Sequence, residues 1–199
     1  MSPMSRRTVV LLTWVLLPAA VPLTATPARA AEPFKISGAG VGPHGLPFPG
    51  QDPREHWSVG EATHLGLYYG DGTLRTDTAV PSPTGTDITG QFGGGSPYTF
   101  TGADGDELVT WYGRTDHGAA EPGAYDISIL GALPDGALLV QASFVAEFVA
   151  VPGQSTGRFA GVTGSWTMYA ETAPFVLGSS DPLLYWWEGT GSLTFPRGR

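Results

Sequence analysis

The chain has 199 residues, with 29 glycines, 18 prolines and no cysteine, and it carries a formal net charge of −8. An acidic protein repels polyanions, so the charge argues against nucleic-acid binding and against attachment to an anionic membrane surface. The lack of cysteine excludes disulfides, so the fold must depend on its apolar core. Aromatic residues make up 11% of the chain, which is typical of a folded protein rather than a disordered one.

Residues 1–30 have the pattern of a signal peptide. Arg6 and Arg7 precede an apolar run from Val9 to Leu17, and Ala28-Arg29-Ala30 offers small residues for cleavage near Ala30. The run is about half of the roughly 20 residues that span a bilayer, which disfavours a membrane anchor. We therefore predict a secreted, extracytoplasmic protein, exported by either the general or the twin-arginine route. Cleavage leaves seven basic and eighteen acidic residues, a net charge of −11.

After the signal peptide, residues 31–56 form an extended Pro/Gly-rich N-terminal segment, and residues 57–199 form the main domain. The stretch from Gly38 to Gln51 contains Pro43, Pro47 and Pro49, which remove hydrogen-bond donors and fix φ. We expect a long loop there, before the first strand of the domain.

Short alternating segments separated by turns follow to the end of the chain. No stretch repeats apolar residues at helical spacing, which predicts an all-β fold. Asp104-Gly105 between two β-rich runs predicts a hairpin. The expected strands include Trp57–Tyr69, Tyr98–Thr101, Glu107–Tyr112, Ala137–Val151, Val162–Ala170 and Leu183–Phe195. About eight strands with short connections predict a single antiparallel β-barrel, because closure removes exposed sheet edges.

One segment resembles a known family. Residues Gly153–Thr167 contain Thr-Gly-Arg-Phe-Ala-Gly-Val-Thr-Gly followed by an alternating strand, and residues 60–66 and 187–195 add weaker matches. This pattern is similar to uncharacterised bacterial secreted barrels of the allene oxide cyclase and dirigent-like superfamily. The resemblance implies an eight-stranded barrel, often in an oligomer, whose apolar interior holds a hydrophobic substrate. The cysteine of plant-type cyclase sites is missing here, so the activity stays open.

The candidate catalytic residue is Glu61. It shares a face of its predicted strand with Trp57, and a carboxylate inside an apolar barrel could serve as a general acid or base. The alternative is an outward-facing glutamate on a solvated strand face, which is the interpretation favoured for Glu147 and Glu188.

Aromatic residues are the candidate ligand-binding groups. Adjacent strand residues point to opposite faces, so each aromatic pair places one ring inside and one outside. The rings expected to bind a hydrophobic ligand are Trp57, Trp111, Trp166, Tyr185 and Trp187. The outer rings of Trp186 and Tyr69 could stack on a sugar, contact another subunit, or have no particular role.

Neither a metal site nor a cofactor is predicted. His56 and His64 lie eight residues apart in one expected strand, about 26 Å, which is too far for one metal ion. Three hypotheses for function follow: an exported barrel that binds a small hydrophobic ligand, a cyclase or isomerase that uses Glu61, and a carbohydrate-binding or structural protein of the cell envelope. A homo-oligomer is compatible with each of them.

Overall fold

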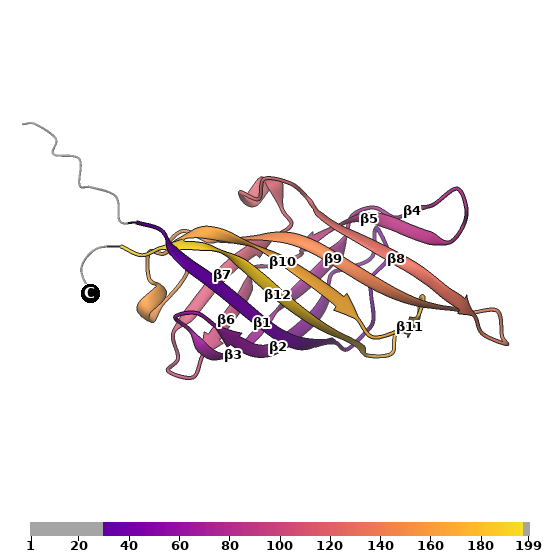
Figure 1. The fold of residues 1–199 in the computed structure, drawn as a ribbon, viewed down its shortest axis with the longest axis horizontal. Coiled ribbons are helices and arrows are strands. Elements are labelled where there is room, and N and C mark those ends of the chain that lie inside the picture. The colour runs from indigo at the N-terminus through magenta and orange to yellow at the C-terminus, as the bar shows by residue number, and fades with distance from the viewer. Residues whose placement is uncertain (1–29, 197–199) are drawn as a thin grey trace, which may run out of the picture.

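The computed structural model describes residues 30–196, and the predicted signal peptide lies outside them except for Ala30. Twelve strands and two short 3-10 turns follow one another in these residues (Figure 1). They are β1 Glu32–Gly42, β2 Arg54–Ala62, β3 Gly66–Thr76, β4 Val80–Pro81, β5 Asp87–Gly94, β6 Tyr98–Gly102, β7 Glu107–Tyr112, η1 Thr115–His117, β8 Gly123–Ala132, β9 Leu138–Ala150, η2 Gly157–Phe159, β10 Thr163–Thr172, β11 Phe175–Val176 and β12 Leu183–Thr194.

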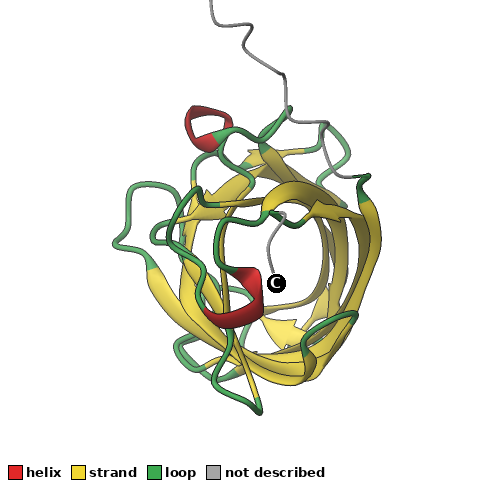
Figure 2. Cartoon of the chain, turned by 90° about the vertical axis from the view of Figure 1, so that its left-hand side faces the viewer, coloured by secondary structure: helices red, strands yellow, loops and turns green. Residues whose placement is uncertain are grey.

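The strands close into a ring, as the end-on view shows (Figure 2). The antiparallel order is β10-β12-β1-β2-β3-β6-β7-β9, and pairing of β9 with β10 completes eight strands. The predicted all-β antiparallel barrel of about eight strands is therefore confirmed. Closure gives each of these strands two neighbours, so the ring has no long open edge.

Two pairs of strands connect β3 to β9 in the barrel wall: β6 and β7 at one end, and β5 and β8 at the other. At one end β3 pairs with β6 through Tyr68–Asp71, and at the other it pairs with β5 through Leu74–Thr76. Likewise β9 pairs with β7 at its C-terminal end and with β8 along the rest. We call the end beside β6 and β7 the η2 end, and the end where β1 finishes the loop end. The β8–β9 hairpin extends the wall beyond the ring at the loop end (Figure 1).

Aromatic side chains fill the middle of the barrel. The ring of Phe148 stacks on Trp166 at 5.3 Å and lies 5.9 Å from Trp187. Two glycines on the inner face of β1 make room for such rings. A Cβ at Gly38 would clash with the Tyr68 hydroxyl, and one at Gly40 would clash with the Tyr185 ring. Glycines in β1 thus allow large side chains from other strands, such as β3 and β12, to cross the interior.

The connection from β9 to β10 closes the η2 end. Phe159 in η2 is fully buried and contacts Phe195 at a ring distance of 5.7 Å. Beside it, the Arg158 guanidinium donates to Asp104 at 2.7 Å and to the His64 carbonyl at 2.9 Å. The segment that carries the family resemblance therefore forms the floor of the barrel.

Two expectations about the N-terminal half were wrong. Gly38–Gly42 belong to β1 and pair with β12 and β2, so the loop begins only after Gly42 and the barrel includes residues before 57. The expected single strand Trp57–Tyr69 is two strands, β2 and β3, because the chain turns at residues 63–65. His64 in this turn has a φ of 67°, which is uncommon for a residue with a side chain.

Candidate functional site

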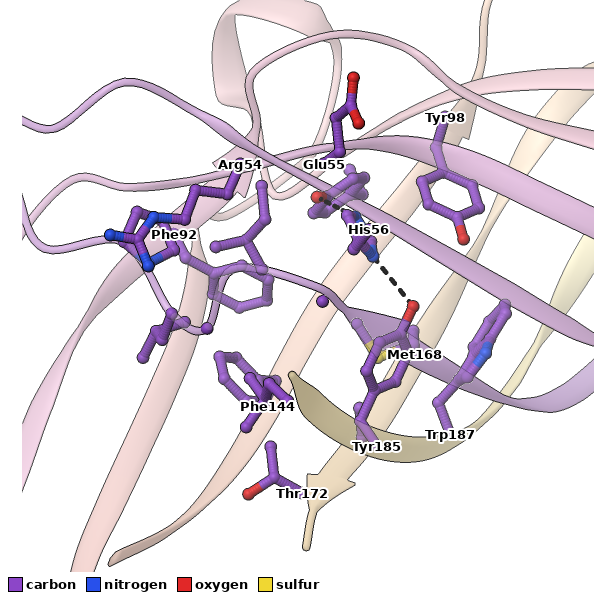
Figure 3. A pocket seen from close by; sticks show the side chains of 18 of the residues that line it. Arg54, Glu55, His56, Phe92, Tyr98, Phe144, Met168, Thr172, Tyr185 and Trp187 are labelled. Atoms are coloured by element: carbon purple, nitrogen blue, oxygen red, sulfur yellow. Dashed lines mark hydrogen bonds between the residues drawn. The ribbon is translucent and has the colours of Figure 1, made fainter. Parts of the chain in front are cut away.

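The barrel interior is hollow at the loop end. A cavity of about 70 Å³ lies there, and most of its wall is aromatic or aliphatic (Figure 3). The apolar side chains that define it include Phe92, Phe144, Phe148, Met168, Leu183 and Trp187. These residues come from four strands, β5, β9, β10 and β12, and the closed ring brings them together.

Three polar side chains cross the barrel beside this cavity, and we call them the His–Tyr cluster: His56 on β2, Tyr112 on β7 and Tyr185 on β12. Nδ1 of His56 lies 2.9 Å from the Tyr185 hydroxyl, and Nε2 lies 2.9 Å from the Tyr112 hydroxyl. Each hydroxyl also reaches a backbone carbonyl, Tyr112 that of Thr73 at 2.9 Å and Tyr185 that of Trp57 at 3.1 Å. The cluster ties together strands that are not neighbours in the ring.

The cluster lacks one hydrogen for the contacts that it makes. Its four contacts need four N–H or O–H hydrogens, but a neutral His56 and two tyrosine hydroxyls supply three. The contact between Tyr185 and the Trp57 carbonyl is the longest of the four. One arrangement consistent with these distances has a His56 ring that donates from Nε2 to Tyr112 and accepts at Nδ1 from Tyr185.

Burial keeps the His–Tyr cluster uncharged. It lowers the pKa of His56 from 6.5 to about 4, because water no longer solvates the imidazolium form. Burial also raises the pKa values of the Tyr112 and Tyr185 hydroxyls, and that of the neighbouring Tyr98. At neutral pH the cluster thus consists of one neutral imidazole and protonated phenols.

One polar group beside the cavity has no protein partner. Among the described residues, Nε1 of Trp187 is buried and makes no hydrogen bond. A buried donor without a partner is rare in folded proteins, because leaving its hydrogen bond unmade costs free energy. The Trp187 ring lines the cavity, while Nε1 itself lies beside Gly38 of β1.

The loop of residues 43–53 covers the cavity. Leu46 and Pro47 contribute to its wall, and the Arg54 guanidinium holds the loop by donating to the His44 carbonyl and, at 3.1 Å, to Gln51 Oε1. Arg54 opens β2, so it connects the loop directly to the barrel wall.

The outer side of the same loop borders a second space. An apolar crevice of about 200 Å³ lies between Leu46, Pro47 and Phe48 on one side and β4, β5, β8 and β11 with their flanking residues on the other. Phe48 is 42% exposed. The loop lies between the crevice and the cavity, since Leu46 and Pro47 line both.

Three of the five predicted ligand-binding rings point into the barrel. Trp187 and Tyr185 line the cavity, whereas Trp166 lies deeper, packed against Phe148 and Phe34. The other two point outward. Trp111 is on the outer face of β7 and stacks on His117 at 3.9 Å, and Trp57 is 37% exposed.

Glu61 also lies on the outer face, exposed, so the expectation of an interior carboxylate was wrong. The inner face of β2 carries His56, Ser58, Gly60 and Ala62, and the residues between them point outward. The physical reason is space. The small inner residues leave room for rings from other strands, such as Tyr98, whose hydroxyl bonds to Ser58 at 2.9 Å.

The carboxylate nearest to the cavity is Glu55, and its side chain is exposed and points away from the other lining residues (Figure 3). In the part of the chain that the structure describes, no group of three histidine or acidic side chains could hold a metal ion. The cavity can therefore offer apolar contact, hydrogen bonds and a neutral imidazole. Sequence reasoning missed His56 and Tyr112, and the small inner residues beside His56 were the available signal.

No family model, curated protein or solved structure matches this chain. The resemblance to allene oxide cyclase and dirigent-like barrels accordingly stays a prediction. Residues 30–196 contain no helix with the length and apolar character needed to cross a bilayer.

Proposed function

We propose that this protein is an exported β-barrel that binds a small, mainly apolar molecule carrying a hydroxyl group at the loop end. The observation that supports this most is the unpaired N–H of Trp187 beside an apolar cavity that also contains the His–Tyr cluster. A ligand hydroxyl can accept from Trp187 and donate to the Tyr185 oxygen, whose own hydrogen points to His56. The apolar part of the ligand would contact the remaining, mainly apolar wall of the cavity.

Cavity size limits the ligand. A volume of 70 Å³ is below the roughly 150 Å³ of an engineered cavity that binds benzene, and far below the roughly 300–1,000 Å³ of typical ligand pockets. Only a few heavy atoms fit while the 43–53 loop stays in place. Anything larger requires this loop to move, which would join the cavity to the 200 Å³ crevice on its outer side.

The observations favour binding over catalysis. Glu61, the base required by the cyclase or isomerase hypothesis, is on the outer face. Both ring nitrogens of His56 are engaged by tyrosine hydroxyls, so neither is free to take a proton from a substrate. The export part of the proposal is supported by the sequence of residues 1–30.

The proposal can be tested by calorimetric titration with cyclopentanol, cyclopentanone and methylcyclopentane, three probes of similar size that fit once the 43–53 loop moves. We expect cyclopentanol to bind about fivefold more tightly than methylcyclopentane, the effect of about one net hydrogen bond. The ketone should lie between them, because it accepts but does not donate. Equal affinities for the alcohol and the hydrocarbon would refute the role of the polar groups.

A matched pair of variants locates the site. Ala170 lines the cavity, so Ala170→Leu should fill it and abolish binding, whereas Ala39→Leu on the exposed face of β1 should leave binding unchanged. Native mass spectrometry of the full chain purified from its own host should show a co-purifying small molecule. Binding that survives Ala170→Leu would place the ligand elsewhere and refute the proposal.

A further inference from the structure

A second concave surface lies on the outside of the barrel, separated from the cavity by the wall. This outer groove, of about 840 Å³, runs across β1, β12, β10, β9 and β8, the first three of which lie side by side in Figure 1. Its outward-pointing polar and aromatic side chains include Ser37, Asp126, Tyr169, Glu171, Trp186 and Glu188. The cavity proposal does not use any of them.

Rings and carboxylates alternate in the centre of the outer groove. Tyr169 on β10 is opposite Glu188 on β12, and Glu171 is opposite Trp186. Side chains opposite each other in an antiparallel sheet have Cβ atoms about 4.5–5.5 Å apart, and diagonal neighbours are about 7–8 Å apart. Each ring therefore has one carboxylate directly beside it and the other ring on the diagonal.

These groups are open to solvent. Tyr169 is 58% exposed and Trp186 is 46% exposed. Among the described residues Glu188 makes no hydrogen bond or ion pair, and Glu171 accepts one bond, from Gln141 at 3.0 Å. No lysine, arginine or histidine lines the outer groove, so its charge is uniformly negative.

We propose that the outer groove binds a glycan whose sugar rings carry free amino groups. The C–H face of a pyranose ring is apolar and packs on an exposed aromatic ring, while its hydroxyl groups donate hydrogen bonds to carboxylates. A protonated amino group on the same sugar reaches the carboxylate beside that ring, which gives a charge-assisted hydrogen bond. The alternation of Tyr169, Glu188, Trp186 and Glu171 matches this combination of an apolar face and a cationic edge.

Charge disfavours the other occupants. Anionic polymers are repelled by Asp126, Glu171 and Glu188. A second copy of this acidic chain would bury these carboxylates against a surface that is itself negative, and burying unpaired charge is costly. A cationic peptide satisfies the carboxylates, but its flexible side chains do not provide the flat apolar face that the two exposed rings accommodate.

The test measures the affinity of the full mature chain for β-1,4-linked glucosamine hexasaccharide by calorimetry, at low and at physiological salt. Fully N-acetylated hexasaccharide of the same length tests the need for the amino groups, and hexalysine tests for attraction by charge alone. We expect the amine-bearing sugar to bind, more weakly at higher salt, and at least fivefold more tightly than either comparison ligand.

Variants assign this binding to the outer groove. Trp186→Ala and Glu188→Gln should each weaken it about threefold to tenfold, the range for one stacking contact or one charge-assisted bond. Trp57→Ala and Glu55→Gln remove an equally exposed ring and carboxylate outside the groove and should change nothing. All four side chains are exposed, so unchanged thermal melting can verify the fold of each variant.

Three results would overturn the proposal. They are equal binding of the N-acetylated sugar, equal binding of hexalysine, and no binding of the glucosamine oligomer. Equal weakening by the Trp57 and Trp186 variants would also exclude the outer groove as the site. A Leu183→Phe variant distinguishes the two proposals, because Leu183 lines the cavity and not the outer groove, so it should abolish binding in the cavity and leave glycan binding intact.

Discussion

The pH dependence of stability offers the sharpest test of the His–Tyr cluster. Burial lowers the folded-state pKa of His56 to about 4, while the unfolded chain should titrate near 6.5. Between these values the unfolded chain binds a proton that the folded chain does not. The stability that neutral His56 provides is therefore complete above about pH 6.5 and is lost as the pH falls to about 4. Below pH 4 both states are protonated, and this residue causes no further loss.

The size of the effect follows from the shift. A pKa difference of about 2.5 corresponds to roughly 3 kcal/mol, since each unit is worth 1.36 kcal/mol. This is an upper limit, because His56 is only half-buried by surface area and water screens part of the charge. Protonation also supplies the fourth hydrogen that the cluster lacks, which opposes the loss. We expect an observed decrease of about 1–3 kcal/mol between pH 7 and pH 4.

The assay is urea denaturation at half-unit pH intervals from 7.5 to 3.5, on the full mature chain and on two variants. His56→Gln should remove the decrease between pH 6.5 and 4, at the cost of lower stability at pH 7. His44→Gln, in the exposed part of the loop, should keep the wild-type profile. A wild-type profile that is flat in this window, or one that His56→Gln does not change, would refute the assignment of a neutral, buried His56.

Other predictions concern the same end of the barrel. Tyr185→Phe leaves Nδ1 of His56 without its partner and should lower the free energy of unfolding by about 1–3 kcal/mol, measured by urea denaturation; no loss would show that the hydroxyl is dispensable. Gly40→Ala should cost more than Gly50→Ala, up to about 3 kcal/mol, because its Cβ clashes with the Tyr185 ring, whereas Gly50→Ala meets no atom and should cost about 1 kcal/mol for its positive φ; equal losses in thermal melting would contradict this order. Arg54→Ala should accelerate hydrogen exchange in the 43–53 loop while the strands stay protected, and unchanged exchange would mean that other contacts hold the loop.

The strands most clearly predicted from sequence are those with unambiguous faces. In β9 alanines and phenylalanines alternate with polar or smaller apolar residues, and the structure places Ala142, Phe144 and Phe148 inside. The hairpin of β6 and β7 follows from Asp104-Gly105, where Gly105 has the positive φ that such turns require. In these segments the local pattern and the overall fold agree, so the alternation of residues and the residues of the turn are enough to predict the strands.

Prediction failed where the inner face is made of small residues. In β2 the apolar face of Trp57 and Val59 is the outer one, because Ser58, Gly60 and Ala62 leave space for rings from other strands. The glycines of β1 also led to a wrong prediction. Read along the chain they indicate a loop, yet they are required at positions where Tyr68 and Tyr185 cross the barrel. In each case the conformation depends on the volume of a side chain that is distant in sequence, and the local sequence carries no information about that side chain.

The His–Tyr cluster was beyond local inference for a related reason. Its hydrogen bonds join residues that are 56 and 129 positions apart, and neither distance follows from periodicity. His56 alone is indistinguishable from a surface histidine until the ring closes around it. The same holds for the outer groove, where the Tyr169–Glu188 pairing depends on the register of β10 and β12.

The cluster also explains why only one end of the barrel is hollow. At the η2 end the side chains of Phe159 and Val162 are apolar and fully buried, so they can pack closely and leave no space. At the loop end hydrogen bonds of 2.9 Å fix His56, Tyr112 and Tyr185 between opposite walls, so these rings cannot shift into the space beside them without losing those bonds. A packed core would need the cluster to be replaced by apolar residues. The cavity and the cluster, which is one hydrogen short, are therefore one feature, and this is why we propose a ligand hydroxyl as the complement of the cluster.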